Sequence, residues 1–243
     1  MRTDRPAVLA AAAAVAAVLL AGCGSYTEEP VASPTPTPTK DTAPSPSPEP
    51  SPEPTKTVEP VDPHPGIADL IITTSGLGPL TVGTTPPAIN PGAAMIAWDE
   101  DYCVSDVMET PPDPGRWVPS GYDNDTNYMG EPATPFYLDA GDAGVHRIDV
   151  MGTRPHTVEG IRIGSTLAEL QATYPALVGP LAGPVSQVWW LQDASGSIAF
   201  ETQGADMLGA GPPEQVILIR VLAPGIDPAW GAANSGNVAG ACF

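Results

Sequence analysis

The chain has 243 residues, 32 of them proline, and its 28 acidic residues outnumber nine basic ones, for a formal charge of −19. Beyond residue 65 there are twenty acidic residues, five arginines and no lysine, a balance of −15. Such a surface repels nucleic acid and anionic lipid headgroups, so neither is expected as a partner. It is compatible with a soluble surface, a cationic partner or a divalent cation.

The first segment has the pattern of an export signal. Two arginines within the first five residues precede an apolar run over 7–20, which is shorter than the roughly 20 residues that span a bilayer. The run ends in Leu20-Ala21-Gly22-Cys23, which resembles the lipobox of bacterial lipoproteins. The resemblance implies that residues 1–22 are a signal peptide and that Cys23 carries a diacylglycerol, with palmitate among its acyl chains. The alternative is a secreted protein with a chance cysteine at the cleavage site.

Residues 23–65 are expected to be a disordered tether. Proline stands at nearly every second position, between serine, threonine and acidic residues. Such a segment buries too little apolar surface to fold, and it favours extended polyproline II at about 3.1 Å per residue. A reach on the order of 100 Å follows, enough to hold a domain away from the outer face of the bacterial cytoplasmic membrane. A ligand role for the PxxP pattern is the alternative, and the composition also suggests O-glycosylation.

A strand–glycine–cap phrase occurs twice in the remaining chain. Pro79–Thr85 reads PLTVGTT and Glu159–Leu170 reads EGIRIGSTLAEL, with apolar residues alternating before each glycine. The second copy has the spacing of a capping box, which predicts a helix over 167–174. In the first copy, prolines at 86 and 91 limit the helix to two turns.

Strand-like runs follow each copy of the phrase. They cover 94–98, 102–104, 136–138 and 145–151 after the first copy, and 187–191, 197–201 and 215–222 after the second. The inferred unit is a strand, a helix and an antiparallel meander. The sequence therefore predicts an α+β fold in which two tandem repeats, 66–156 and 157–243, form one sheet with helices on one face.

The repeated phrase also carries a family resemblance. The segments GLGPLTVGTT and GIRIGSTLAELQATYP, with later strands such as IAFET and QVILIRV, resemble a group of uncharacterised lipoproteins of high-GC Gram-positive, actinobacterial type. The hydrophobic-x-hydrophobic-Gly-Ser/Thr pattern is more remotely similar to the repeat of the beta-lactamase-inhibitor-protein and outer-membrane-assembly lipoprotein folds. Those domains bind proteins and have no catalytic centre, which implies a binding role here. The resemblance implies no site residues, because no contact motif matches position by position.

Cys103 and Cys242 remain once Cys23 is lipidated. An exported protein meets an oxidising compartment, where two cysteines usually form a disulfide. A Cys103–Cys242 disulfide is therefore expected to hold the C-terminal residues against the first half of the domain. A metal or nucleophile role is disfavoured, because no CxxC motif or set of nearby histidines accompanies the pair.

Calcium is the one cofactor that the sequence suggests. Asp123, Asp125 and Asn127 place oxygen atoms at alternate positions, as a calcium loop does. The pattern then departs from that motif, because Tyr128 stands where glycine is required and the glutamate of position twelve is missing. A polar surface loop with Asx turns explains the same residues. Asp99–Asp101 is a second acidic cluster.

Neither histidine of the folded part, His146 or His156, comes with a recognisable catalytic motif, and no GxSxG segment is present. The long loop 111–135 is the expected binding surface, because it carries Trp117, Tyr122 and Tyr128 among prolines. The alternative is that these rings pack the loop against the core.

The sequence thus predicts a lipid-anchored extracytoplasmic domain without catalytic activity that binds another envelope protein or a cell-wall component, or acts as an envelope scaffold. A cell-wall or carbohydrate-active hydrolase that uses acidic residues is one alternative, and a calcium-dependent adhesion module is another. A concave pocket with two buried carboxylates would favour the hydrolase.

Overall fold

The computed structural model describes residues 61–183, 186–203, 214–229 and 237–242. The chain divides into two compact units, Met1–Thr55 and Lys56–Phe243, and all described residues belong to the second. The predictions on residues 1–22, on Cys23 and on most of the tether lie outside the described residues. Within the described ranges, no helix combines the length and apolar character needed to cross a membrane.

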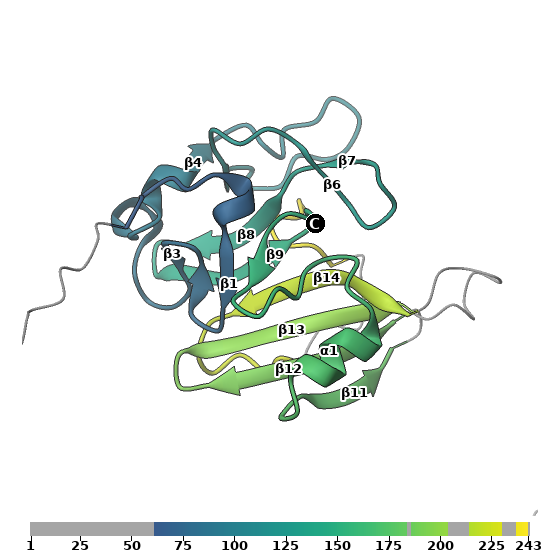
Figure 1. Ribbon diagram of the computed structural model, residues 1–243. Helices are drawn as coiled ribbons and strands as arrows, with labels where there is room; N and C mark the ends of the chain where they lie inside the picture. The colour runs from purple at the N-terminus through teal and green to yellow at the C-terminus, as the bar shows by residue number, and fades with distance from the viewer. Residues whose placement is uncertain (1–60, 184–185, 204–213, 230–236, 243) are drawn as a thin grey trace, which may run out of the picture. The chain divides into compact units, whose positions relative to one another are not determined.

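A six-stranded antiparallel sheet is the largest element of the second unit (Figure 1). In spatial order its strands are β11 (Val178–Ala182), β12 (Gln187–Asp193), β13 (Gly196–Gln203), β14 (Gln215–Leu222), β9 (Gly144–Val150) and β8 (Phe136–Gly141). The last strand in the sequence, β14, therefore pairs with β9 from the first half of the domain. Ile219 lies opposite Val150, and Val221 lies opposite Ile148. Such β-branched pairs favour a central position in a sheet.

Short elements from the first half of the domain surround this sheet. β10 (His156–Thr157), β1 (Ile71–Thr73), β2 (Gly76–Leu77) and β3 (Leu80–Thr81) form a four-stranded sheet in that order, and β1 and β10 are parallel. Three 3-10 helices are η1 (Ile67–Asp69), η2 (Pro87–Ile89) and η3 (Ala93–Met95). Two further hairpins join β4 (Ile96–Asp99) to β5 (Arg116–Pro119) and β6 (Asp125–Thr126) to β7 (Pro132–Ala133).

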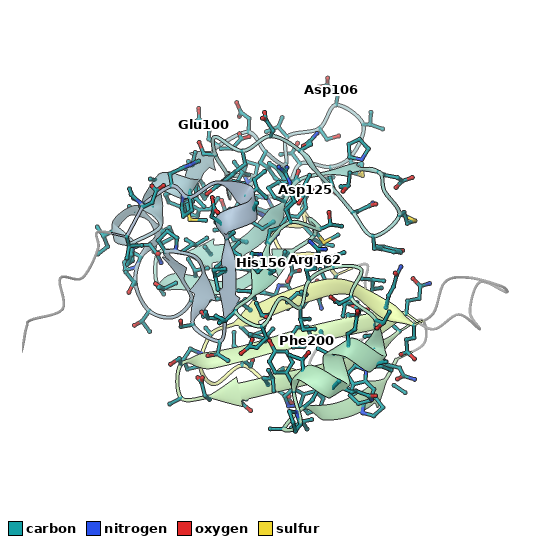
Figure 2. All side chains as sticks on the ribbon, in the orientation of Figure 1. Glu100, Asp106, Asp125, His156, Arg162 and Phe200 are labelled. Atoms are coloured by element: carbon teal, nitrogen blue, oxygen red, sulfur yellow. A yellow bond between two sulfur atoms is a disulfide. The ribbon has the colours of Figure 1, made fainter. Side chains whose placement is uncertain are left out.

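The core lies on one face of the large sheet, between it, the four-stranded sheet and the helix α1 (Leu167–Thr173). The buried side chains of this core include Leu70, Ile72, Leu77, Leu80, Met95, Phe136, Ile148, Leu170, Trp189, Phe200 and Ile219. Figure 2 shows Phe200 between the sheet and α1, where its ring stacks on Tyr174 with centroids 5.9 Å apart.

The opposite face of the large sheet has a smaller apolar cluster of Val188, Ala199 and Leu222, with Trp190 packed against it. Trp189 and Trp190 thus face opposite sides of β12, as period-two alternation predicts. The same opposite face carries Asp149 and Arg220, which are both buried. One face is therefore a conventional hydrophobic core, and the other contains charged groups in its centre.

The predicted α+β fold with two strand–helix–meander repeats is wrong. The structure is mostly β, and α1 is its one α-helix in the described part of the chain. Gly83 and Gly164 do share a feature, because each has positive φ and donates its N–H to the large sheet, to Val145 O and Val216 O, both at 2.8 Å. Only Gly164 leads into an α-helix. Around the first glycine, prolines remove amide donors and the chain forms 3-10 turns instead.

The predicted disulfide is confirmed, because Cys103 and Cys242 lie at bonding distance with a Cα–Cα separation of 5.4 Å. Cys103 follows β4, and its backbone N–H donates to Pro114 O at 3.0 Å. The bond therefore holds residues 237–242 beside the β4–β5 hairpin.

We expect Thr166→Ala to lower the free energy of unfolding by about 1 kcal/mol. Thr166 accepts the backbone N–H of Glu169, and its own N–H and hydroxyl donate to the Glu169 carboxylate. These bonds hold the pKa of Glu169 below its ordinary value. The stability that they contribute is present above the unfolded-state pKa and is lost as the pH falls through the folded one. The effect should therefore shrink in urea titrations near pH 3, while exposed Gln171→Ala should change little at either pH.

Candidate functional site

The three aromatic side chains of the expected binding loop pack inward. Trp117, Tyr122 and Tyr128 are half-buried and contact the main core. The Tyr122 ring stacks on His64 at a centroid distance of 4.4 Å and meets the edge of Phe136 at 5.7 Å. Burial, with a smaller effect of the Asp62 charge, raises the pKa of Tyr122 to about 12. The structure thus places these three rings where they hold the loop against the domain.

Trp98 lies on β4 of the β4–β5 hairpin, and 49% of its surface is exposed to solvent. It lies directly opposite Trp117 in the β4–β5 pairing, and the two rings form an edge-to-face pair with centroids 5.7 Å apart. The backbone of Gly115 lies against the Trp98 ring so closely that a Cβ there would come within 2.1 Å of Cζ2. Two neighbours therefore hold the exposed indole in place.

We expect Gly115→Ala to displace the Trp98 ring and to lower stability by about 1–3 kcal/mol, because the added methyl group overlaps the ring. Near-ultraviolet circular dichroism of the variant should lose the contribution of the Trp98–Trp117 pair, while the far-ultraviolet spectrum is retained. Gly141→Ala is the control, since a Cβ there meets no atom within 4 Å. An unchanged near-ultraviolet spectrum for Gly115→Ala would contradict the ring contact.

Trp98 lines a cleft of about 520 Å³ between the β4–β5 hairpin, the β8–β9 hairpin and the C-terminal residues. We call it the Trp98 cleft, and its lining is Trp98, Asp113, Gly115, Arg116, Trp117, Leu138, Asp139, Ala140, Gly141, Asp142, Arg147, Asn237, Val238, Gly240 and Ala241. Three of these residues, Asp113, Asp139 and Asp142, are exposed acids. The volume lies within the range of about 300–1,000 Å³ that is usual for ligand pockets.

A buried ion cluster lies beside the cleft on the second face of the sheet. Asp149 Oδ1 is 3.2 Å from Arg220 Nε and 3.6 Å from Arg147 Nε. Burial raises the pKa of the Asp149 carboxyl, while the charges of Arg220 and Arg147 act in the opposite direction. Asp149 and Arg220 are almost fully buried. Arg147 lines the cleft, and 11% of its side chain is exposed.

The C-terminal residues cover this cluster. Ala239 donates its N–H to Asp149 Oδ2 at 2.8 Å, and Arg220 donates to the carbonyl of Asn237. Arg116 donates to Asp113 O and Gly115 O, both at 2.7 Å, and to Ala241 O at 3.4 Å. Arg116 thus binds backbone carbonyls on both sides of the cleft, and its role is to hold the walls together.

The residues of the suggested calcium loop are engaged in other contacts. Asp125 accepts from Arg154 Nε and N, both at 2.9 Å, and forms an ion pair with that side chain. Asn127 Oδ1 accepts the N–H groups of Met129 and Glu131, and Asp123 is exposed. Within the described ranges, no group of three or more His, Cys, Asp or Glu side chains is placed to hold a metal ion.

The acidic segment Asp99–Asp101 is exposed at the end of β4. Figure 2 shows Glu100 and, further along the β4–β5 connection, Asp106 at the outer edge of the molecule. This placement fits a solvated loop.

The groups that could act in catalysis do not converge in the described part of the chain. His146 is exposed, and the Nδ1 atom of His156 lies 3.2 Å from the carbonyl of Arg154. The buried carboxylates Asp125, Asp149 and Glu201 contact Arg154, Arg220 and Ser186, respectively, and none of the three lines the Trp98 cleft. The arrangement that would favour a hydrolase, two buried carboxylates in one pocket, is therefore not what this cleft contains.

A second, more open hollow of about 640 Å³ follows the segment Glu159–Ser165 and the start of α1. Its lining is polar and aliphatic, without a large aromatic ring. Tyr174 donates its hydroxyl proton to the Glu159 carboxylate, which lowers the pKa of that carboxyl, and its oxygen lies 2.6 Å from Thr157 Oγ1 at the neighbouring turn. These contacts give the segment a structural role, and the Trp98 cleft is the better candidate for a ligand.

Sequence reasoning missed Trp98, Gly115 and Arg147. A signal for Arg147 was present, because two of the five arginines in the domain stand inside strands with buried apolar residues, in VHRIDV and VILIRVL. A charged residue inside a buried strand requires a partner, and Asp149 lies within the first of these segments.

No protein-family model and no curated protein sequence matches the chain. Among solved structures, the chain is similar to the uncharacterised protein yfeY from Escherichia coli, with 18% sequence identity and a TM-score of 0.35. The match covers 63% of this chain and 99% of that one.

Proposed function

We propose that this chain is a lipid-anchored extracytoplasmic domain that binds a component of the bacterial cell envelope in the Trp98 cleft and performs no catalysis. The lipobox-like segment 20–23 and the proline-rich tether support the location. A tether that ends at the domain leaves the cleft free to reach targets at some distance from the membrane.

The observation that carries the binding role is the exposed indole of Trp98. Exposure of the apolar face of a tryptophan to water is unfavourable. Contact with a ligand removes this face from water, and exposed tryptophans are therefore frequent in recognition surfaces. Here the ring is held by Gly115 and Trp117 at the wall of a cleft, so it is ordered before a ligand arrives. Pre-ordered aromatic groups bind with a smaller entropic cost than mobile ones.

The binding role is tested by photo-crosslinking in growing cells. The variant Ala241→p-benzoylphenylalanine places a reactive ketone at an exposed position in the cleft and keeps Trp98, and Ile89→p-benzoylphenylalanine places it at another exposed position, 72% exposed, outside the cleft. Ultraviolet light is expected to give an adduct of higher mass from position 241 and none from position 89. No adduct at 241, or equal adducts at both positions, would exclude the cleft as the binding site.

The anchor is tested separately with a clickable palmitate analogue. The wild-type chain should incorporate the label and sediment with membranes, whereas Cys23→Ala should lose both properties. If the variant is labelled to the same extent as the wild type, Cys23 is not the lipid attachment site.

A further inference from the structure

The chemistry of the Trp98 cleft restricts its ligand, and this inference rests on the proposed function of that cleft. The lining supplies hydrogen-bond acceptors from the exposed carboxylates of Asp113, Asp139 and Asp142. It also supplies donors from Arg147 and an apolar surface from Trp98. A ligand that satisfies all three must carry hydroxyl groups and C–H surface at once.

Arg147 is available to such a ligand. Its Nε atom is buried and faces Asp149 Oδ1 at 3.6 Å, so a ligand can reach the exposed 11% of the side chain, which lines the cleft. Asp139 stands opposite Arg147 in the β8–β9 register, so a donor and an acceptor lie side by side on the cleft wall. A sugar hydroxyl both donates and accepts, and it can therefore bridge these two side chains.

The charge distribution disfavours ions as ligands. An anion would approach three exposed carboxylates and a domain with a balance of −15. A cation would instead have to approach Arg116 and Arg147 in the interior of the cleft. An uncharged polyhydroxylated molecule avoids both repulsions, and each hydrogen bond that it makes to a charged side chain is stronger than a neutral one.

We propose that the Trp98 cleft binds an uncharged oligosaccharide. The C–H face of one sugar ring stacks on the Trp98 indole, hydroxyl groups donate to Asp139 and Asp142, and Arg147 donates to a ring or hydroxyl oxygen. Arg116 contributes by holding the walls, because its Nη atoms donate to Asp113 O, Gly115 O and Ala241 O. Sugars at a cell wall provide this chemistry within reach of a tethered domain.

Calorimetric titration of the mature lipoprotein, in a detergent without a sugar headgroup, tests the inference. The probes are tetrasaccharides of N-acetylglucosamine, mannose, galactose and arabinose, together with acidic tetragalacturonate. We expect at least one uncharged tetrasaccharide to bind, with an affinity that changes less than threefold between 50 and 500 mM salt. Trp98→Ala and, independently, Asp142→Asn should weaken this binding at least tenfold. Both side chains are exposed, so the variants should remain folded, and Ile89→Ala should bind as the wild type does.

Three results would overturn the inference: no uncharged tetrasaccharide binds, only tetragalacturonate binds, or binding survives both Trp98→Ala and Asp142→Asn. Photo-crosslinking from position 241 separates this failure from failure of the proposed function. A protein adduct at 241 without saccharide binding would leave the cleft as a binding site and reject the ligand class. A missing adduct together with missing saccharide binding would reject both.

Discussion

Replacement of both Cys103 and Cys242 with serine is expected to lower the free energy of unfolding by about 2–5 kcal/mol. The two residues are 139 positions apart, so the disulfide closes a long loop in the unfolded chain. Loss of that constraint raises the conformational entropy of the unfolded state, and in the chain-entropy model a loop of this length gives about 5 kcal/mol. Engineered and natural disulfides often give less, which sets the lower end of the range.

The same replacement should affect the Trp98 cleft. Residues 237–242 cover the ion cluster through Ala239 and Asn237, and the disulfide joins their end to the region after β4. Released from Cys103, these residues keep their backbone hydrogen bonds with Asp149, Arg220 and Arg116 but lose the covalent link. Residues 237–242, which form one wall of the cleft, should therefore detach more often in the variant than in the oxidised protein.

Urea unfolding followed by tryptophan fluorescence measures the effect, with the wild-type protein studied both without and with a reductant. Reduced wild-type protein should unfold at the same urea concentration as the Cys103→Ser, Cys242→Ser variant, and oxidised wild type should need more. A difference below about 0.5 kcal/mol would mean that the other contacts of the C-terminal residues suffice. Protection of the Ala239 amide from hydrogen exchange should fall in the variant, since its bond to Asp149 would open locally.

Local features of the domain followed from the sequence. The capping box at Thr166 and Glu169 produced α1 as expected, and the alternating runs at 145–151, 197–201 and 215–222 correspond to β9, β13 and β14. The disulfide followed from compartment and cysteine count. The helix and the strands depend on residues that are close in sequence. The disulfide could be predicted because, apart from Cys23, the chain has two cysteines and therefore one possible pairing.

The order of the strands did not follow from the sequence. The alternation of apolar and polar residues indicates that a segment is a strand with one buried face. It does not indicate which strand lies beside it in the sheet. The pairing of β14 with β9 joins residues about seventy positions apart. It places strands from both predicted repeats, 66–156 and 157–243, next to each other in one sheet. The prolines at 86 and 91 have a larger effect than the predicted shortening of the helix, because the chain after Gly83 forms 3-10 turns and no α-helix.

The Trp98 cleft required the tertiary structure for the same reason. Trp98, Arg147 and Ala241 come from three distant segments and are brought together by the β8–β9 hairpin and the disulfide. The loop 111–135 was correctly singled out as unusual. Its rings pack inward because Tyr122 and Trp117 contact the main core, and the exposed ring, Trp98, stands before the loop.

Asp149→Asn is expected to lower the free energy of unfolding by about 3–5 kcal/mol. The change keeps the shape of the side chain and leaves an acceptor for the Ala239 N–H, but it removes the negative charge that faces Arg220 at 3.2 Å. Arg220 is 2% exposed and cannot reach water without a rearrangement of the sheet face. A buried guanidinium without its carboxylate retains its desolvation cost and loses most of the compensating attraction.

A double-mutant cycle separates this charge effect from simple loss of packing. Asp139→Asn is the matched control, because it is an exposed aspartate on the neighbouring strand and should change stability by less than about 0.5 kcal/mol. Arg220→Met in the Asp149→Asn background should recover part of the lost stability, since it removes the uncompensated charge and keeps the apolar stem. If Asp149→Asn alone costs less than about 1 kcal/mol, or if Arg220→Met adds its own full cost to it, the ion cluster does not stabilise this face. The C-terminal residues would then be held over the sheet mainly by the disulfide.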